Sequence, residues 1–233
     1  MKAPVLKACS SRNSQFCKMK GHVKNVLLIT PLLLGVIYSG FPQVPTPTME
    51  SARAVGKNNI EMKGGLSVLR SHFGDETNIS SLIMSYQAAF GFSNETSLGL
   101  RYDNSPEYGF ISLIPKYSAE SIFGFIFPIG FGIGDMDDDS FQIELRPTCL
   151  FSFPKNIKYI EATIAPGMSM NISGEGFGTQ LNVEFNAGFS SNFDVWTIRP
   201  SFGFYKYLGE GSEGYYWDWG ISFVFKLDTA EKL

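Results

Sequence analysis

Two short stretches of the 233-residue sequence carry side chains that could bind a metal ion or transfer a proton. The first is GDMDDDS, where four carboxylates lie close together: Asp135, Asp137, Asp138 and Asp139. Carboxylate oxygens are the ligands that Ca²⁺ prefers, so this stretch is a candidate site for a divalent cation. It lacks the glycine and the final glutamate of an EF-hand loop, and the favoured interpretation is therefore a solvated acidic loop.

The second stretch surrounds His72, which is followed by Asp75 and Glu76 and is the only histidine after residue 54. A histidine near carboxylates can serve as a general base, so a hydrolase that uses His72 is one functional alternative. No further catalytic motif accompanies it, and GEGFG at 174–178 is not a phosphate-binding loop because no helix is expected after it. We therefore predict no enzymatic activity and no cofactor.

The elements that must position these residues are β-strands, because polar and apolar residues alternate along much of the chain. In QLNVEFNAGF, residues 180–189, every second residue is apolar and the residues between them are polar or glycine. A period of two gives a strand one apolar and one polar face. A soluble protein would enclose the phenylalanines, whereas a barrel in a bilayer would enclose Glu184 and turn Phe185 toward lipid.

The alternating segments number ten and lie at about 59–71, 81–92, 96–103, 108–118, 121–133, 140–152, 158–171, 179–190, 193–207 and 214–227. Every second connection is short (SNET, YSAE, FPKN and SNF), and the others are mostly longer and acidic. Short turns at one rim and longer loops at the other are typical of outer-membrane barrels. The sequence therefore predicts an all-β fold, a closed antiparallel up-and-down transmembrane β-barrel of about ten strands, with eight as the alternative because the third and fourth segments are short.

The two faces of these segments differ in size as well as in polarity. The apolar face carries large residues such as Phe123, Trp219 and Phe223, whereas the polar face carries many glycines and serines among its charges. A soluble barrel would have to enclose the large aromatics, and its outer face would carry solvated Lys and Glu rather than glycine. Lipid sets no packing limit on outward side chains, and barrel closure pairs every backbone N–H and C=O, as hydrocarbon requires. We therefore predict that Phe185 faces lipid and that Glu184 faces the lumen.

Aromatic residues also gather near both ends of the predicted strands. Near the long-loop rim lie Tyr102, Tyr108, Tyr205, Tyr215 and Trp217. Near the short-turn rim lie Phe92, Tyr117, Tyr159 and Trp196. Such girdles place amphipathic rings at the two membrane interfaces.

Ten charged residues fall on the face that we assign to the lumen: Glu61, Lys63, Arg101, Lys116, Glu144, Arg146, Glu161, Glu184, Arg199 and Asp218. Five are acidic and five are basic, so their charges balance. Because an isolated buried charge costs several kcal/mol, we predict a structural ion-pair network that plugs the lumen. The alternative is a narrow polar path for small solutes, porin-like, whose selectivity these residues would set.

The first 40 residues have the pattern of a secretory signal peptide, with a basic start and an apolar run from Val26 to Tyr38. Met19 is an alternative start, because residues 1–18 are unusually long for the basic region. We expect cleavage after Gly40; Ala52-Arg53-Ala54 also has suitable small residues but lies far beyond the apolar run.

The rest of the chain divides into three parts. Residues 41–58, which include FPQVPTPT, are predicted to form an extended periplasmic linker. The barrel occupies 59–227, and a tail follows at 228–233. Cys149 is the only cysteine beyond the leader, so no disulfide is expected within the mature chain.

The last predicted strand, DWGISFVF, resembles the C-terminal sorting signal of bacterial outer-membrane proteins, with Asp218, Gly220, Phe223 and Phe225 at the matching positions. The usual pattern ends on the aromatic residue, whereas eight residues follow Phe225 here. The resemblance to small outer-membrane β-barrels covers about residues 59–227 and implies recognition by the barrel-assembly machinery.

These observations together predict an exported protein of the outer membrane. It has a structural or surface-exposed role, and its partners are membrane lipid and lipopolysaccharide. Nucleic acid is excluded as a partner because the residues after 54 hold 12 Lys/Arg against 21 Asp/Glu, and binding to phosphates needs cationic neutralisation.

Overall fold

The computed structural model describes residues 47–73, 76–104, 109–133, 141–153, 158–173, 176–208 and 214–229. Its strands are β1 (Asn59–Phe73), β2 (Glu76–Gly91), β3 (Thr96–Asn104), β4 (Gly109–Ala119), β5 (Phe123–Ile126), β6 (Ile129–Ile133), β7 (Gln142–Leu145), β8 (Thr148–Phe153), β9 (Ile160–Ser173), β10 (Gly176–Phe189), β11 (Trp196–Leu208) and β12 (Gly214–Asp228). No helix among the described residues is long and apolar enough to cross a membrane.

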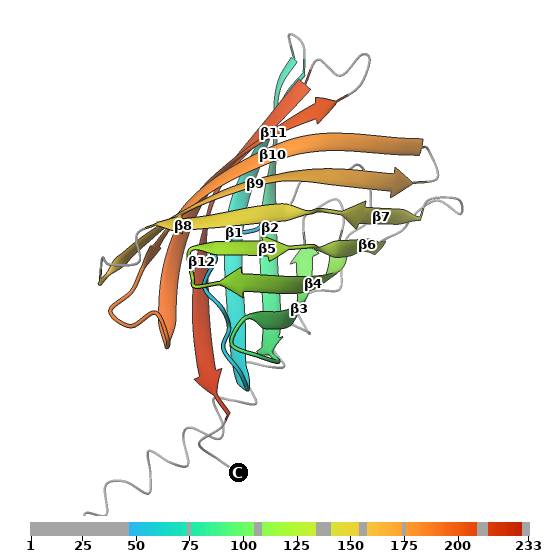
Figure 1. The fold of residues 1–233 in the computed structure, drawn as a ribbon. Coiled ribbons are helices and arrows are strands. Elements are labelled where there is room, and N and C mark those ends of the chain that lie inside the picture. Colours follow the sequence, from blue (N-terminus) through green and yellow to red (C-terminus); the bar gives the residue numbers. More distant parts are fainter. Residues whose placement is uncertain are drawn as a thin grey trace, which may run out of the picture. The chain divides into compact units, whose positions relative to one another are not determined.

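The strands form a closed antiparallel barrel (Figure 1). Each strand pairs with the next one along the chain, once β5 with β6 and β7 with β8 are each counted as one strand. β12 pairs with β1 along its whole length, from Asn59 opposite Asp228 to Phe73 opposite Gly214. This pairing joins the first strand to the last and leaves no free sheet edge at the seam. The predicted fold class is confirmed.

Prolines explain why a barrel of ten strands contains twelve strand segments. β5 and β6 are separated at Phe127 and Pro128, and both pair with the same strand, β4. β7 and β8 likewise pair with β9 and are separated at Arg146 and Pro147. Proline has no N–H to donate to the ladder, which favours the interruptions at Pro128 and Pro147, although β4, β9 and β11 continue through their own prolines. Counted as continuous walls, the barrel has the ten strands that the sequence predicts.

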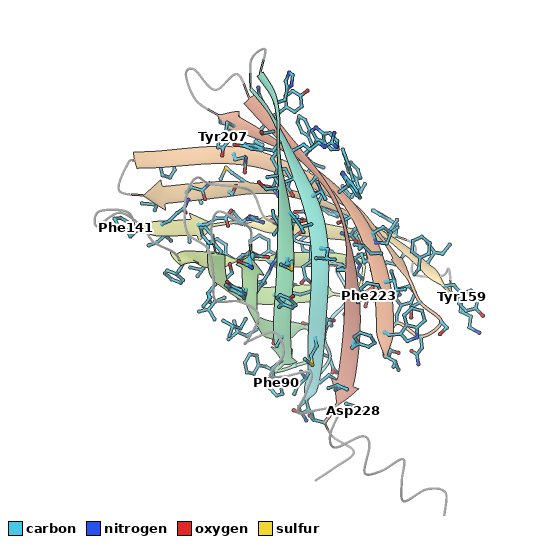
Figure 2. The ribbon with its side chains drawn as sticks, turned by 180° about the vertical axis from the view of Figure 1, so that it is seen from behind. Phe90, Phe141, Tyr159, Tyr207, Phe223 and Asp228 are labelled. Atoms are coloured by element: carbon cyan, nitrogen blue, oxygen red, sulfur yellow. The ribbon has the colours of Figure 1, made fainter. Side chains whose placement is uncertain are left out.

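The two faces of the wall have the predicted orientation. On β10, Phe185 is 48% exposed, whereas its neighbour Glu184 is 0% exposed. The same outward exposure is found for Phe90, Tyr159 and Phe223, whose side chains project from the wall in Figure 2. Large apolar side chains on the outside and charges on the inside are the arrangement of a barrel in lipid rather than in water.

The prediction of the aromatic girdles is wrong for one residue, Tyr205. Tyr205 is 1% exposed and points inward, where its hydroxyl donates a hydrogen bond to Asp218 at 2.7 Å. It lies on the same face of β11 as Arg199 and Ser201, so the alternation that placed those residues inside places Tyr205 there as well. Tyr108 lies outside the described residues.

The interior also contains apolar residues, whereas the alternating pattern predicts mainly small and charged ones there. One cluster joins Ile114, Ile126, Leu150 and Ala165 to Ala52, a residue that precedes the first strand. A second cluster joins residues of four strands: Leu69, Ile83, Tyr205 and Tyr216. These clusters fill the space between the polar side chains with packed side chains, so the interior is partly an ordinary protein core.

We expect Phe185→Arg to destabilise the barrel by about 2–4 kcal/mol, because an outward cation far from the interfaces must be taken into hydrocarbon. Unfolding in urea, followed by the loss of heat-modifiable gel migration in phospholipid vesicles, measures this change. Leu208→Arg, at the end of β11, is the matched control, and its expected cost is about 0–1 kcal/mol. Equal costs at the two positions would mean that Phe185 does not face lipid.

Candidate functional site

All ten charged residues that the sequence assigns to the lumen lie on the inner face of the wall and are buried. The structure adds Asp103 and Lys226 from the wall, and it adds Glu50 and Arg53 from the segment before β1. With these four, the described part of the interior holds seven acidic and seven basic side chains. Their formal charges balance, as do those of the ten residues predicted from the sequence.

The segment formed by residues 47–55 lies among these side chains, inside the barrel. Of its residues, Thr48, Met49, Glu50, Ser51, Ala52 and Val55 are 0–3% exposed. The sequence predicts an extended periplasmic linker over residues 41–58, whereas the structure shows that residues 47–55 of this range form an enclosed segment. Pro and Thr residues are equally suited to an extended linker and to an extended enclosed segment, so composition did not separate the two.

Glu184 on β10 binds the start of this segment. Its carboxylate accepts hydrogen bonds from the backbone N–H of Thr48 at 2.7 and 2.8 Å and from the Thr48 hydroxyl at 2.6 Å. A further bond comes from the N–H of Met49 at 3.2 Å. Bonds between a carboxylate and backbone N–H groups are charge-assisted and stronger than neutral ones. They also satisfy N–H groups that have no strand partner.

Glu50 contacts the opposite wall. Its carboxylate forms an ion pair with Lys63 on β1, and its second oxygen lies 3.0 Å from the Nζ of Lys116 on β4. The side-chain amide of Gln87, on β2, donates to the same carboxylate at 2.9 Å. The Glu50 carbonyl accepts a bond from Asn186 at 2.8 Å, so this one residue connects β1, β2 and β4 to β10.

The later part of the segment is held in the same way. The backbone N–H of Ala52 donates to the Ser152 hydroxyl at 2.9 Å, and the Ala54 carbonyl accepts from Lys226 at 2.8 Å. Arg53 forms an ion pair with Glu161. Its guanidinium also lies 4.3 Å from the centre of the Phe193 ring. Such cation–π contacts add to the ion pair because the ring face is electron-rich.

Two glycines of the wall leave room for the segment. A Cβ added to Gly65 would lie 2.8 Å from the sulfur of Met49, and one added to Gly220 would lie 2.7 Å from its terminal carbon. Inward glycines therefore form the hollow that accepts the Met49 side chain.

The segment then turns into β1 through Gly56, whose φ of 91° lies in the left-handed region that favours glycine. A Cβ on Gly91 would lie 1.8 Å from the Gly56 carbonyl oxygen, so the close approach of the two backbones requires glycine at position 91. The Asn58 N–H then donates to the Gly91 carbonyl at 2.9 Å, which anchors the turn to the end of β2.

The wall contains ion pairs of its own. The Arg146 guanidinium lies 2.6 Å from the carboxylate of Glu144 on β7, and the Arg101 guanidinium lies 2.7 Å from the carboxylate of Asp103 on the same strand, β3. Asp103 could have been found from the sequence, because residues two apart on a strand share a face. Lys226 could have been found in the same way, because it is an even number of residues from Asp218 on β12 and therefore shares its face. Glu50 has no such signal, since it does not belong to a strand.

The other sequence candidates are not brought into this site. Asp135, Asp137, Asp138 and Asp139 lie outside the described residues, as does Asp75. His72 lies on the outer face of β1 with its ring 4.9 Å from that of Tyr215. No cluster of metal-binding side chains is found within the described ranges.

No family model matches the chain, and no curated protein matches it. Among solved structures it is similar to the N-terminal β-barrel domain of Pseudomonas aeruginosa OprF, at 9% identity over 74% of this chain and 99% of that one, with a TM-score of 0.36. It is also similar to Ail of Yersinia pestis, at 9% identity over 73% and 99% of the two chains and a TM-score of 0.36. The translocator domain of the autotransporter NalP from Neisseria meningitidis shares 8% identity over 72% and 87%, with a TM-score of 0.42.

We expect Gly65→Val to displace the enclosed segment, because the new side chain would occupy the space of Met49. Hydrogen exchange of the amides of residues 48–55, measured by mass spectrometry on the refolded barrel, should become at least tenfold faster. Gly64→Val is the control, since a Cβ at Gly64 meets no atom within 4 Å, and it should leave the exchange rates unchanged. Equal exchange in the two variants would contradict the close contact at Gly65.

Proposed function

We propose that the protein is an integral outer-membrane β-barrel with a structural or surface-exposed role, closed to solutes by its own segment of residues 47–55. The single observation that carries this proposal is the double attachment of the segment, to Glu184 on one wall and to Lys63 and Lys116 on the other. A chain held across the interior from both sides occupies the path that a solute would take.

The size of the cavity beside the segment supports a closed interior at this point. The cavity beside the segment has a volume of about 10 Å³ open to the centre of a water molecule, which is about the room that a single water needs. Thr48 and Glu50 bound it on one side, and wall residues that include Arg101, Glu144 and Arg146 bound it on the other. These side chains belong to the ion-pair network, so a solute entering here would have to break existing pairs.

The membrane and the direction of insertion follow from the sequence pattern and the outer surface. A predicted leader for export, and connections that the sequence pattern predicts to be longer and acidic at one rim and short at the other, favour the outer membrane, with the acidic connections outside the cell. Membrane lipid and lipopolysaccharide are then the surrounding partners. The sorting-signal-like strand β12 is the segment that the barrel-assembly machinery would recognise.

We expect the wild-type protein to be electrically silent in planar lipid bilayers, and Glu50→Lys to produce steady single-channel current steps. The substitution puts a third cation beside Lys63 and Lys116, so repulsion replaces the two ion pairs that hold the segment. Glu95→Lys is the matched control, because it makes the same charge change in an exposed turn and should stay silent. Steady current steps from the wild-type barrel would refute the closed lumen and favour a solute channel.

We expect the mature N-terminus, sequenced from purified outer membranes, to lie before Pro47. Cleavage after Ala54 would remove Thr48 and Glu50, and would leave the carboxylate of Glu184 and the ammonium groups of Lys63 and Lys116 buried without their partners. Edman degradation or terminal-peptide mass spectrometry identifies the first residue. A mature chain beginning at Val55 would contradict the role of the segment.

A further inference from the structure

The outer face of the described strands is almost entirely apolar, and Arg70 and Lys206 are exceptions to this. Arg70 takes an outward position on β1 between Val68 and His72, and Lys206 takes one on β11 and is exposed. No other Lys, Arg, Asp or Glu occupies an outward position inside the described strands, the strand ends apart. Charges on a lipid-facing surface are costly unless they reach an interface, so two cations in one place need an explanation.

The strand register places these two cations close to each other at the long-loop rim. β12 separates β1 from β11, with Trp217 opposite both Arg70 and Phe204, and Tyr215 opposite both Lys206 and His72. Neighbouring strands lie about 4.8 Å apart, so the Cα atoms of Arg70 and Lys206 are about 10–12 Å apart. Both side chains are long enough to reach a group that sits over Tyr215 and Trp217.

The rings between the cations contact neighbouring side chains. The guanidinium carbon of Arg70 lies 5.3 Å from the centre of the Trp217 ring, and the Tyr215 ring lies 5.5 Å from Phe204. The Tyr215 hydroxyl and the Trp217 indole N–H are hydrogen-bond donors on the same surface. The sector therefore combines two cations with neutral donors, which is the combination that binds phosphate oxygens.

Arg70 has unused hydrogen-bonding capacity. Its Nε is buried and has no hydrogen-bond partner, and within the described ranges neither Arg70 nor Lys206 forms a salt bridge. The pairing of β1 with β2 also shifts register between Arg70 and His72. Such irregularities change the direction of the side chains next to them. An arginine at an irregularity, supported by a ring and lacking an acidic partner, is suited to an anion from outside the chain.

We propose that Arg70, Lys206, Tyr215 and Trp217 bind a phosphate group of lipid A, the membrane anchor of lipopolysaccharide, from the outer leaflet. The surface lies at the long-loop rim, where the phosphates of that leaflet meet the barrel in the orientation proposed above. This inference rests on that orientation but not on a closed lumen. A cation that merely extends to the interface would contact any anionic headgroup equally, whereas a site with two cations and two ring donors requires a phosphate at one position.

Lys158 provides the comparison at the opposite rim. Its Nζ lies 5.4 Å from the centre of the Tyr159 ring, which resembles the contact of Arg70 with Trp217. In the proposed orientation this rim meets the inner leaflet, so Lys158 should make no contribution to the binding of lipid A.

The test uses the full mature chain refolded in detergent micelles and titrated with diphosphorylated lipid A, with native mass spectrometry as the measure of bound lipid. We expect the double substitution Arg70→Gln, Lys206→Gln to weaken binding at least tenfold, and Lys158→Gln to change it less than twofold. Removal of both phosphates from lipid A should weaken its binding to the wild-type barrel by at least the same factor as the double substitution does.

Each alternative outcome overturns the inference in a recognisable way. Equal binding of dephosphorylated lipid A would show that acyl chains alone are recognised. Equal competition by phosphatidylglycerol would show an unspecific anionic contact. Heat-modifiable migration checks that the variants are folded; if the double variant fails this check, the exposed Lys206→Gln alone should still weaken binding severalfold. Bilayer conductance is scored separately, so an open lumen would refute the proposed closure without affecting this site.

Discussion

Pairing of the whole of β1 with β12 is the interaction on which the rest of the structure depends. Fifteen residues of each strand face one another, from Asn59 and Asp228 at one end to Phe73 and Gly214 at the other. Hydrocarbon offers no hydrogen bonds to an open strand edge, so a sheet can cross a bilayer only when its first and last strands are joined. Closure decides which face is enclosed, and the two-residue period then decides which side chains go there.

Closure creates a second requirement, because it encloses charged side chains together with the backbone. Glu184 is fully buried, and Lys63 and Lys116 are nearly so. Enclosed ions must be paired or hydrogen-bonded, since removing one partner of a buried pair costs about 3–5 kcal/mol. The segment before β1 supplies the missing partners, with backbone N–H groups for Glu184 and the Glu50 carboxylate for the two lysines. The wall and the enclosed segment therefore stabilise each other.

The alternation of polar and apolar residues predicted most of the fold, but it gave no information on residues outside the strands. A period of two predicts that Glu184 faces inward and Phe185 outward, because each strand has one polar and one apolar side. The same period predicts the ten strands and the ten enclosed charges. The misplaced Tyr205 was an error in applying the same rule. The segment of residues 47–55 could not be found in this way, since it is not a strand and its position depends on Glu184, Lys63 and Lys116, which are distant from one another in sequence. Its partners could be identified one by one, but the joint site could not.

The inner and outer surfaces are specified by different forces, and this difference explains why the shape of a side chain is more strictly constrained on the inner surface. Outward positions need an apolar side chain of almost any shape, because lipid adapts to it. The enclosed segment has few apolar anchors, mainly Met49 and Ala52, and is held by directed bonds to charged groups. The short turn at Gly56–Asn58 tethers it to β1, which raises its effective concentration at the site and favours docking even when each bond contributes modestly. Substitutions inside should therefore act through geometry and charge, whereas substitutions of the outward apolar side chains should act through polarity.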